Sequence, residues 1–260
     1  MKKGPGFLNS MLGGAVGAAL GVALIQWAGW PRAAAGPASQ DLVQERILAE
    51  VQQIKAAMQA GPQPAAAPQI QKPPADVRLD LTDAASRGRA DAKLVLVEFS
   101  DFDCPFCARF SRDTKDQLMK EYVDTGKVRY VFKHMPLGRL HPRAQREAEA
   151  AECARRQNRF WEIYPLLFTN QQPSPDADIR QQAMTAGVGA AAFDTCFAGQ
   201  ATEKVLKDLD EGARAGIIGT PTFFIGTLDS TGRLKVEDRL VGAEPIAKFK
   251  ALIDKYLAGI

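Results

Sequence analysis

The sequence predicts an α/β domain with an all-helical insertion, from three observations. The apolar, β-branched run at 94–99 indicates a buried strand. Directly after it, apolar residues recur at multiples of four and indicate one face of a helix: Phe106, Phe110, Leu118 and Tyr122. Between about 141 and 214 the chain shows several helical patterns and no strand pattern. Strands must therefore flank a helical segment.

The N-terminus, residues 1–35, has the pattern of an export element. Lys2 and Lys3 precede an uncharged stretch, 4–31, whose most apolar part is 11–30. Because a membrane span needs about 20 residues, this run is long enough to cross a bilayer. We expect an extracytoplasmic, periplasmic domain held at the inner membrane by residues 11–30.

Cleavage of this element stays open. Trp27 and Trp30 close the apolar run as an interfacial aromatic pair, which favours an uncleaved signal anchor. The alanines at 33–35 also allow a cleaved signal peptide. Both alternatives export the rest of the chain.

Residues 36–60 predict a short amphipathic helix, in which apolar residues alternate three and four apart: Ile47, Val51, Ile54 and Met58. This spacing is typical of the a and d positions of a short coiled coil, which would make the protein a homo-oligomer. The alternative is a membrane-proximal spacer helix. Residues 61–76 are rich in proline and alanine and predict an extended linker. The main domain, 77–260, follows.

Within 77–260 the elements follow in order. We expect a strand at 77–81, a polar loop at 86–91, the strand at 94–99, a helix at 105–123 and a strand at 128–132. The last three form a βαβ unit with parallel strands. After the insertion, 222–225 and 234–241 predict an antiparallel pair, and 245–257 a closing helix.

The motif Cys104-Pro105-Phe106-Cys107 places a dithiol at the predicted strand-to-helix junction. Pro105 suits the first helical position. Unpaired N–H groups and the helix dipole there favour a thiolate at Cys104. Cys107 lies on the same helical face and can close a disulfide. We expect Cys104 to be the exposed nucleophile and Cys107 the buried resolving thiol.

Two other uses of this motif are a zinc half-site and a purely structural disulfide. Zinc would need a second, closely spaced pair of ligands. The remaining cysteines, Cys153 and Cys196, stand apart, and the only histidines are His134 and His141. The sequence implies no metal and no organic cofactor.

Glu98 lies late in the predicted strand, six residues before Cys104. A buried carboxylate there could hold the proton that Cys107 must lose before it attacks a mixed disulfide. The alternative is a surface glutamate at the edge of the sheet.

Two segments, 96–103 and 216–226, together resemble the DsbA-like thiol:disulfide oxidoreductases of the thioredoxin superfamily. The resemblance covers about 77–258 and implies a thioredoxin fold with a helical insertion at about 141–214. It further implies that Glu98 occupies the position of an acidic residue typical of that family. Pro221 would match the family's cis-proline, which faces the dithiol. The backbone of Thr220 would then pair with bound peptide, beside Pro105 and Phe106.

Cys153 and Cys196 both occur in helical contexts of the insertion. In an exported protein the simple interpretation is a structural disulfide between two helices, worth roughly 2–4 kcal/mol. Two free buried thiols are the alternative.

The predicted function is disulfide exchange with cysteine-containing client proteins, served by a membrane redox partner. A disulfide isomerase or reductase is the alternative, because Phe106 cannot donate a hydrogen bond to the Cys104 thiolate, and Asp101 and Asp103 should oppose it. A thiol or copper carrier is a further alternative. The net charge of +3, with interspersed charges, gives no basis for a nucleic-acid partner.

Overall fold

The computed structural model describes residues 44–45, 47–52, 55, 74, 76–169 and 175–259. The chain divides into two units, 1–62 and 63–260. In the first, residues 44–45, 47–52 and 55 are helical, with Ile47 and Val51 more than half exposed. The predicted span at 11–30 and most of the linker at 61–76 fall outside the described residues. Within the part that is described, no helix is both long and apolar enough to traverse a bilayer.

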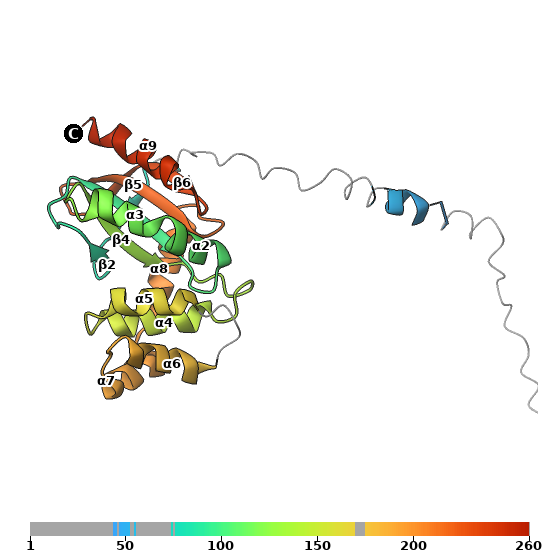
Figure 1. The fold of residues 1–260 in the computed structure, drawn as a ribbon, viewed down its shortest axis with the longest axis horizontal. Coiled ribbons are helices and arrows are strands. Elements are labelled where there is room, and N and C mark those ends of the chain that lie inside the picture. The colour runs from blue at the N-terminus through green and yellow to red at the C-terminus, as the bar shows by residue number, and fades with distance from the viewer. Residues whose placement is uncertain are drawn as a thin grey trace, which may run out of the picture. The chain divides into compact units, whose positions relative to one another are not determined.

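A six-stranded mixed sheet forms the centre of the second unit, in the order β1-β6-β5-β3-β4-β2 (Figure 1). The strands are β1 (Arg78–Leu79), β2 (Ala85–Arg87), β3 (Leu94–Ser100), β4 (Val128–His134), β5 (Thr222–Leu228) and β6 (Leu234–Val241). β3 is parallel to β4 and antiparallel to β5, and β5 is antiparallel to β6. The βαβ unit and the antiparallel pair are as predicted.

The edge strand β2 corrects the expectation of a loop at 86–91. Its three residues pair antiparallel with β4, so that Arg87 lies opposite Tyr130. This pairing satisfies N–H and C=O groups that β4 would otherwise leave open at the sheet edge. A three-residue strand is too short to show alternation in the sequence. β1 is likewise shorter than the predicted 77–81.

All seven residues of β3 are buried, because helices cover both faces of the sheet. Leu94 and Leu96 pack in one apolar cluster with the helices that follow β3 and β6. Val95, Val97 and Phe99 pack in a second cluster on the opposite face. This double burial explains the unbroken apolar run.

The predicted helix at 105–123 is not continuous. It consists of α2 (Pro105–Asp113), α3 (Lys115–Leu118) and a π-helical turn, η1 (Met119–Val123). Thr114 interrupts it with φ −124° and ψ −41°, while its Oγ1 donates to the carbonyl of Glu244 at 3.1 Å. This tertiary contact bends the helix toward α9 (Ile246–Leu257), which covers the same face of the sheet.

The helical insertion contains α4 (Ala144–Arg155), α5 (Phe160–Thr169), α6 (Asp176–Thr185), α7 (Ala190–Thr195) and the π-helical turn η2 (Cys196–Gln200). These elements lie together beside the sheet (Figure 1). Cys153 of α4 and Cys196 of η2 form a disulfide, with their Cα atoms 5.7 Å apart. The predicted pairing is therefore present, and the alternative of two free thiols is excluded.

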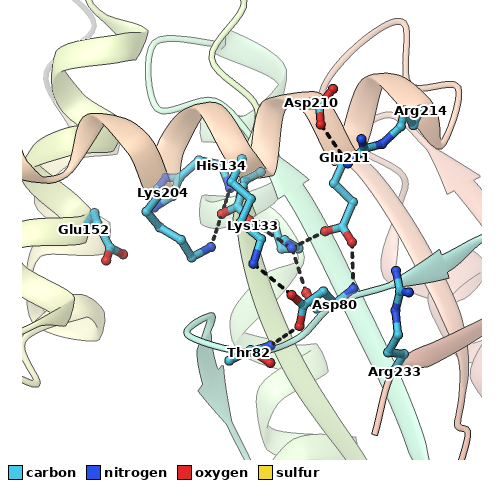
Figure 2. Close-up of polar contacts among 12 residues, drawn as sticks. Asp80, Thr82, Lys133, His134, Glu152, Lys204, Asp210, Glu211, Arg214 and Arg233 are labelled. Carbon is cyan, nitrogen blue, oxygen red and sulfur yellow. Dashed lines mark hydrogen bonds and ion pairs between the residues drawn. The ribbon is translucent and has the colours of Figure 1, made fainter. Parts of the chain in front are cut away.

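α8 (Thr202–Arg214) lies within the predicted limits of the insertion but packs on the sheet, over the second apolar cluster. A buried charged network joins it to the sheet (Figure 2). Lys133 of β4 is 1% exposed and pairs with Asp208 at 2.9 Å and with Glu211. It also donates to the carbonyl of Asp80 at 2.8 Å. These bonds compensate a lysine that would be costly to bury alone.

Candidate active site

Cys104 is the N-cap residue of α2, the helix that follows β3 along the chain. Its backbone is extended, with φ −84° and ψ 122°, and Pro105 begins the helix. The Cys104 carbonyl accepts the first helical hydrogen bond, from Ala108 at 3.0 Å. The thiol thus lies at the positive end of the helix dipole, as the sequence predicts.

The Cys104 thiol is buried, at 3% exposure, which corrects the expectation of an exposed nucleophile. Its Sγ lies 3.5 Å from the carbonyl oxygen of Thr220, so the loop that carries Thr220 covers it. The pKa of Cys104 is lowered to about 6, chiefly by hydrogen bonding from the Cys107 thiol. The Thr220 hydroxyl and two backbone N–H groups of α2 contribute to this lowering, against burial, which raises the pKa.

Cys107 has the opposite character. It is fully buried, and this burial, together with the neighbouring Cys104, raises the pKa of Cys107 well above its usual value. The backbone N–H of Asp101 and the Ser100 hydroxyl act against this rise. The two thiols therefore differ in acidity, and Cys104 ionises first.

Glu98 is buried completely, which excludes the alternative of a surface glutamate. Burial raises the pKa of Glu98 to about 7, against the hydrogen bond from Tyr130, the Ser100 hydroxyl and the positive charge of Lys115. Tyr130, on the neighbouring strand β4, donates its hydroxyl to Glu98 Oε2. A carboxyl group with such a pKa can both accept and release a proton near neutrality.

The loop before β5 completes the site. The Thr220–Pro221 peptide bond is cis, and Thr222 Oγ1 donates to Gly219 at 2.7 Å and so fixes the turn. Thr220 is buried at 9%, whereas Pro105 and Phe106 are exposed. The structure thus brings Thr220 to the dithiol across 116 residues of sequence and leaves Pro105 and Phe106 at the surface.

The two acids before Cys104 are both paired. Asp101 Oδ2 lies 2.7 Å from Nδ1 of His141, and Asp103 binds the guanidinium of Arg143 at 2.8 Å. Each carboxylate therefore has a hydrogen-bonded partner, and the expected opposition of these two acids to the Cys104 thiolate stays a prediction. The pairs also tie the loop before α2 to the segment that leads into α4.

Four further residues at the site were not predicted: Ser100, Tyr130, His141 and Tyr164. Ser100 follows Glu98 by two positions on β3 and therefore lies on the same face of the sheet. The alternation of side chains along a strand could have predicted this placement from the sequence. The Tyr164 ring packs in the core of the insertion, 5.8 Å from the ring of Phe102, and its hydroxyl faces Glu98.

Across the described ranges, no group of three or more His, Cys, Asp or Glu side chains is arranged to hold a metal ion.

The chain belongs to the thioredoxin family, because the profile of that family, described as "Thioredoxin", matches residues 81–254. This range spans the sheet, the dithiol, the insertion and most of α9.

Solved structures show the same fold. Wolbachia pipientis alpha-DsbA1 superposes with a TM-score of 0.59 at 22% identity, over 70% of this chain and 94% of that one. Oxidised BdbD from Bacillus subtilis superposes with a TM-score of 0.59 at 22% identity, over 70% of this chain and 97% of that one. A periplasmic thioredoxin-like protein from Salmonella enterica serovar Typhimurium superposes with a TM-score of 0.53 at 23% identity, over 68% of this chain and 91% of that one. The fold is therefore DsbA-like.

Among curated proteins the chain resembles sodium/proton antiporters. It is 34% identical over 152 residues to Na(+)/H(+) antiporter NhaA 3 of Salinispora tropica, covering 58% of this chain and 23% of that protein. It is 37% identical over 142 residues to Na(+)/H(+) antiporter NhaA 1 of Mycolicibacterium gilvum, covering 54% of this chain and 22% of that protein. The chain thus spans less than a quarter of these relatives, and their names describe activity of the whole proteins.

Proposed function

We propose that this protein is a thiol:disulfide oxidoreductase that exchanges disulfides with cysteine-containing client proteins through Cys104 and Cys107. The observation that carries the proposal is the acidity difference of the two thiols at the start of α2, below a cis-proline loop. Only a thiolate attacks a disulfide, and a low pKa also makes Cys104 a good leaving group. Membership of the thioredoxin family supports the same chemistry.

The reaction runs in two balanced steps. When the pair is oxidised, a client thiolate attacks Cys104 Sγ, the Cys104–Cys107 bond breaks, and Cys107 leaves and takes up a proton. A second client thiolate then attacks the client sulfur of the mixed disulfide, and Cys104 departs as a thiolate. The client gains a disulfide and the protein keeps the two electrons. In the reducing direction Cys104 attacks and Cys107 resolves.

Glu98 serves, in this proposal, as the proton store of Cys107. It is buried on the face of β3 that carries α2, and its pKa of about 7 lets it exchange a proton at neutral pH. A general acid or base with a pKa near the working pH typically contributes about 10²–10⁴-fold to a proton-transfer step.

Client peptides dock, in this proposal, along the loop at Thr220 and Pro221, beside Pro105 and Phe106. Two side chains flanking this region are apolar and open to solvent: Phe106 is 53% exposed and Ile218 is 95% exposed. Exposed apolar residues next to a reactive thiol suit unfolded clients, whose apolar side chains are accessible.

Isomerase or reductase activity is the second candidate, favoured by the moderate pKa of Cys104. A value of about 6 lies between those of thioredoxin, about 7, and DsbA, about 3.5. A less stabilised thiolate makes a weaker oxidant. The apolar Phe106 side chain offers no hydrogen bond that would lower this pKa further.

We further propose that the domain works outside the cytoplasm, with residues 11–30 as the anchor and a membrane redox partner. The basic and apolar N-terminal pattern supports export. A structure with the same fold belongs to a periplasmic protein. Self-association through the helix at 36–60 stays a prediction.

Equilibration with glutathione tests the function. The reduced and oxidised protein are separated after equilibration at fixed ratios of reduced to oxidised glutathione. We expect a potential between roughly −270 and −120 mV, the values of thioredoxin and DsbA. Values toward −270 mV favour the reductase. Absence of any glutathione-dependent Cys104–Cys107 disulfide, with Cys104→Ser behaving like wild type, would overturn the proposal.

A further inference from the structure

Four large apolar side chains are exposed among the described residues of the second unit: Phe106, Leu140, Leu206 and Ile218. Apolar residues scattered singly are normal on a protein surface, whereas a group of them marks a binding surface. Docking along the loop at Thr220 accounts for Phe106 and Ile218. Leu140, which is 73% exposed, has no role in the chemistry so far.

Leu140 lies in the turn between β4 and α4, and Asp101 holds this turn beside the dithiol. The Asp101 side chain is buried completely. Its Oδ2 accepts a hydrogen bond from the backbone N–H of Leu137 at 2.8 Å and lies 2.7 Å from Nδ1 of His141. The Asp101 carbonyl accepts from the N–H of Cys104 at 3.2 Å. One residue therefore joins both ends of the turn to the loop that carries the reactive thiol.

Hydrogen bonds within the turn fix its backbone. The carbonyl of Leu137 accepts from the N–H groups of Leu140 at 2.8 Å and of His141 at 3.0 Å. A turn fixed in this way loses little conformational entropy when it binds a partner. The Leu140 side chain is therefore presented to solvent at a defined place next to the active site.

Cys104 lies between this turn and the loop that precedes β5. Its Sγ is 3.5 Å from the carbonyl oxygen of Thr220. Ile218, two residues before Thr220, is 95% exposed, while the neighbouring Ile217 is buried in the second apolar cluster and anchors the loop. A client chain bonded at Cys104 would therefore pass an exposed aliphatic side chain on each side.

An exposed arginine accompanies the apolar side chains on both sides. Arg139 directly precedes Leu140 and has no hydrogen bond or ion pair with any residue that the structure describes. Arg109 of α2 lies with its guanidinium 5.2 Å from the ring centre of Phe106 and donates to the carbonyl of Ala243 at 3.3 Å. Among the described residues, no carboxylate forms an ion pair with either guanidinium.

The acidic side chains of the same region are withdrawn from the surface. Asp101 and Glu244 are buried. Asp103 binds the guanidinium of Arg143 at 2.8 Å. The side chains exposed around Cys104 are therefore apolar and basic, and the partner that complements them is apolar and acidic.

We propose that the turn 137–141 is a second docking element for clients and selects cysteines flanked by an apolar residue beside an acidic one. Leu140 contacts the apolar side chain of the client, and Arg139 pairs with its carboxylate. The inference rests on the proposed function and deepens it by naming the class of client. The apolar contact supplies affinity, and the charge steers association.

Exchange kinetics with short peptides test the proposal. One peptide carries leucine and glutamate on both sides of a single cysteine, and its relatives replace either the glutamate by lysine or the leucine by serine. Oxidised full-length protein is mixed with each reduced peptide, and acid quenching with mass spectrometry follows the loss of the Cys104–Cys107 disulfide. We expect wild type to react roughly 3–10-fold faster with the leucine peptide than with the serine peptide.

Leu140→Ser tests the apolar contact. This variant should react roughly 3–10-fold more slowly than wild type with the leucine peptide. Leu206→Ser is the matched control, because it removes an exposed leucine of α8, and it should react like wild type. Mercaptoethanol, a small uncharged thiol without such side chains, should react with Leu140→Ser within about twofold of wild type.

Arg139→Glu tests the charge. Each peptide is compared between variant and wild type, which cancels differences in acidity among the peptide thiols. The variant should react more slowly with the glutamate peptide and faster with the lysine peptide, by roughly 2–5-fold each. At an ionic strength of about 1 M the Debye length falls to about 3 Å, so this change should disappear. Lys120→Glu reverses an exposed charge at the far end of the active-site helix and should leave both rates unchanged.

The outcomes are distinct. A Leu140→Ser rate with the leucine peptide equal to that of Leu206→Ser would overturn docking at the turn. Equal slowing of Leu140→Ser with mercaptoethanol would also overturn it, since that indicates a damaged active site. Equal peptide rates in Arg139→Glu and Lys120→Glu would overturn the selection of acidic clients. If the wild-type dithiol reacts with no peptide and not with mercaptoethanol, the proposed function itself fails.

Discussion

The sulfur of Cys104 lies 3.5 Å from the carbonyl oxygen of Thr220, a residue 116 positions further along the chain. This contact places the Cys104 thiol under the loop that contains the cis Thr220–Pro221 peptide bond. It also explains why Cys104 is only 3% exposed although it caps a helix at the end of a strand. In the proposed function, a client sulfur therefore approaches along this loop.

Alkylation should label Cys104 before Cys107. At mildly acidic pH the pKa of Cys104, about 6, leaves a substantial thiolate fraction, whereas burial keeps Cys107 protonated. Reduced protein is treated with iodoacetamide for increasing times, and the labelled peptide is mapped. Faster labelling of Cys107 than of Cys104 would contradict the assignment of roles.

Removing the insertion disulfide should cost stability and spare the chemistry. Cys153 and Cys196 are 43 residues apart, and closing a loop of that size stabilises the folded state by about 3–4 kcal/mol in the chain-entropy model. The double change Cys153→Ala with Cys196→Ala should lower the free energy of unfolding by this amount in denaturant titrations. Glutathione exchange at Cys104 should stay within about twofold. Lost exchange at unchanged stability would assign the pair to the redox cycle.

Replacing Pro221 should affect the release of clients. In Pro221→Ala the new residue brings a backbone N–H beside the dithiol, and Thr220 is no longer held in the same loop geometry. We expect mixed disulfides between Cys104 and a cysteine-containing peptide to accumulate several-fold, measured on non-reducing gels. Thr222→Ser, which keeps the bond to Gly219, is the control. Unchanged adduct levels in Pro221→Ala would count against docking at this loop.

Glu98 should make the fold less stable at high pH. Because its folded pKa, about 7, lies above the ordinary 4.5, the folded state favours the neutral acid. The stabilisation by neutral Glu98 is complete below about pH 4.5 and is lost as pH rises through about 7.

Glu98→Gln removes this titration and keeps a group that can accept from Tyr130. The variant should gain up to about 3 kcal/mol over wild type at pH 8, since each pKa unit corresponds to about 1.4 kcal/mol, and the gain should vanish near pH 4. Urea denaturation at several pH values measures it. A difference that does not depend on pH would show that the pKa of Glu98 is the same in the folded and unfolded states.

Local patterns in the sequence determined much of this protein. The strand at 94–99, the dithiol at a helix start, the helical character of 141–214 and the antiparallel pair follow from periodicity and from the chemistry of proline and cysteine, which act over a few residues. The resemblance of 96–103 and 216–226 to DsbA-like proteins implied the thioredoxin fold, and the position of Glu98 late in its strand predicted the burial of its side chain.

Only the tertiary structure decided the features that depend on distant contacts. Thr114 bends the active-site helix because Glu244 accepts its hydroxyl, and β2 forms because β4 has an open edge. Cys104 is buried because Thr220 covers it. The carboxyl of Asp101 is paired because His141 lies beside it, 40 residues away in sequence. Local propensity does not depend on such distant partners, since each contact forms only when the sheet and its helices have assembled.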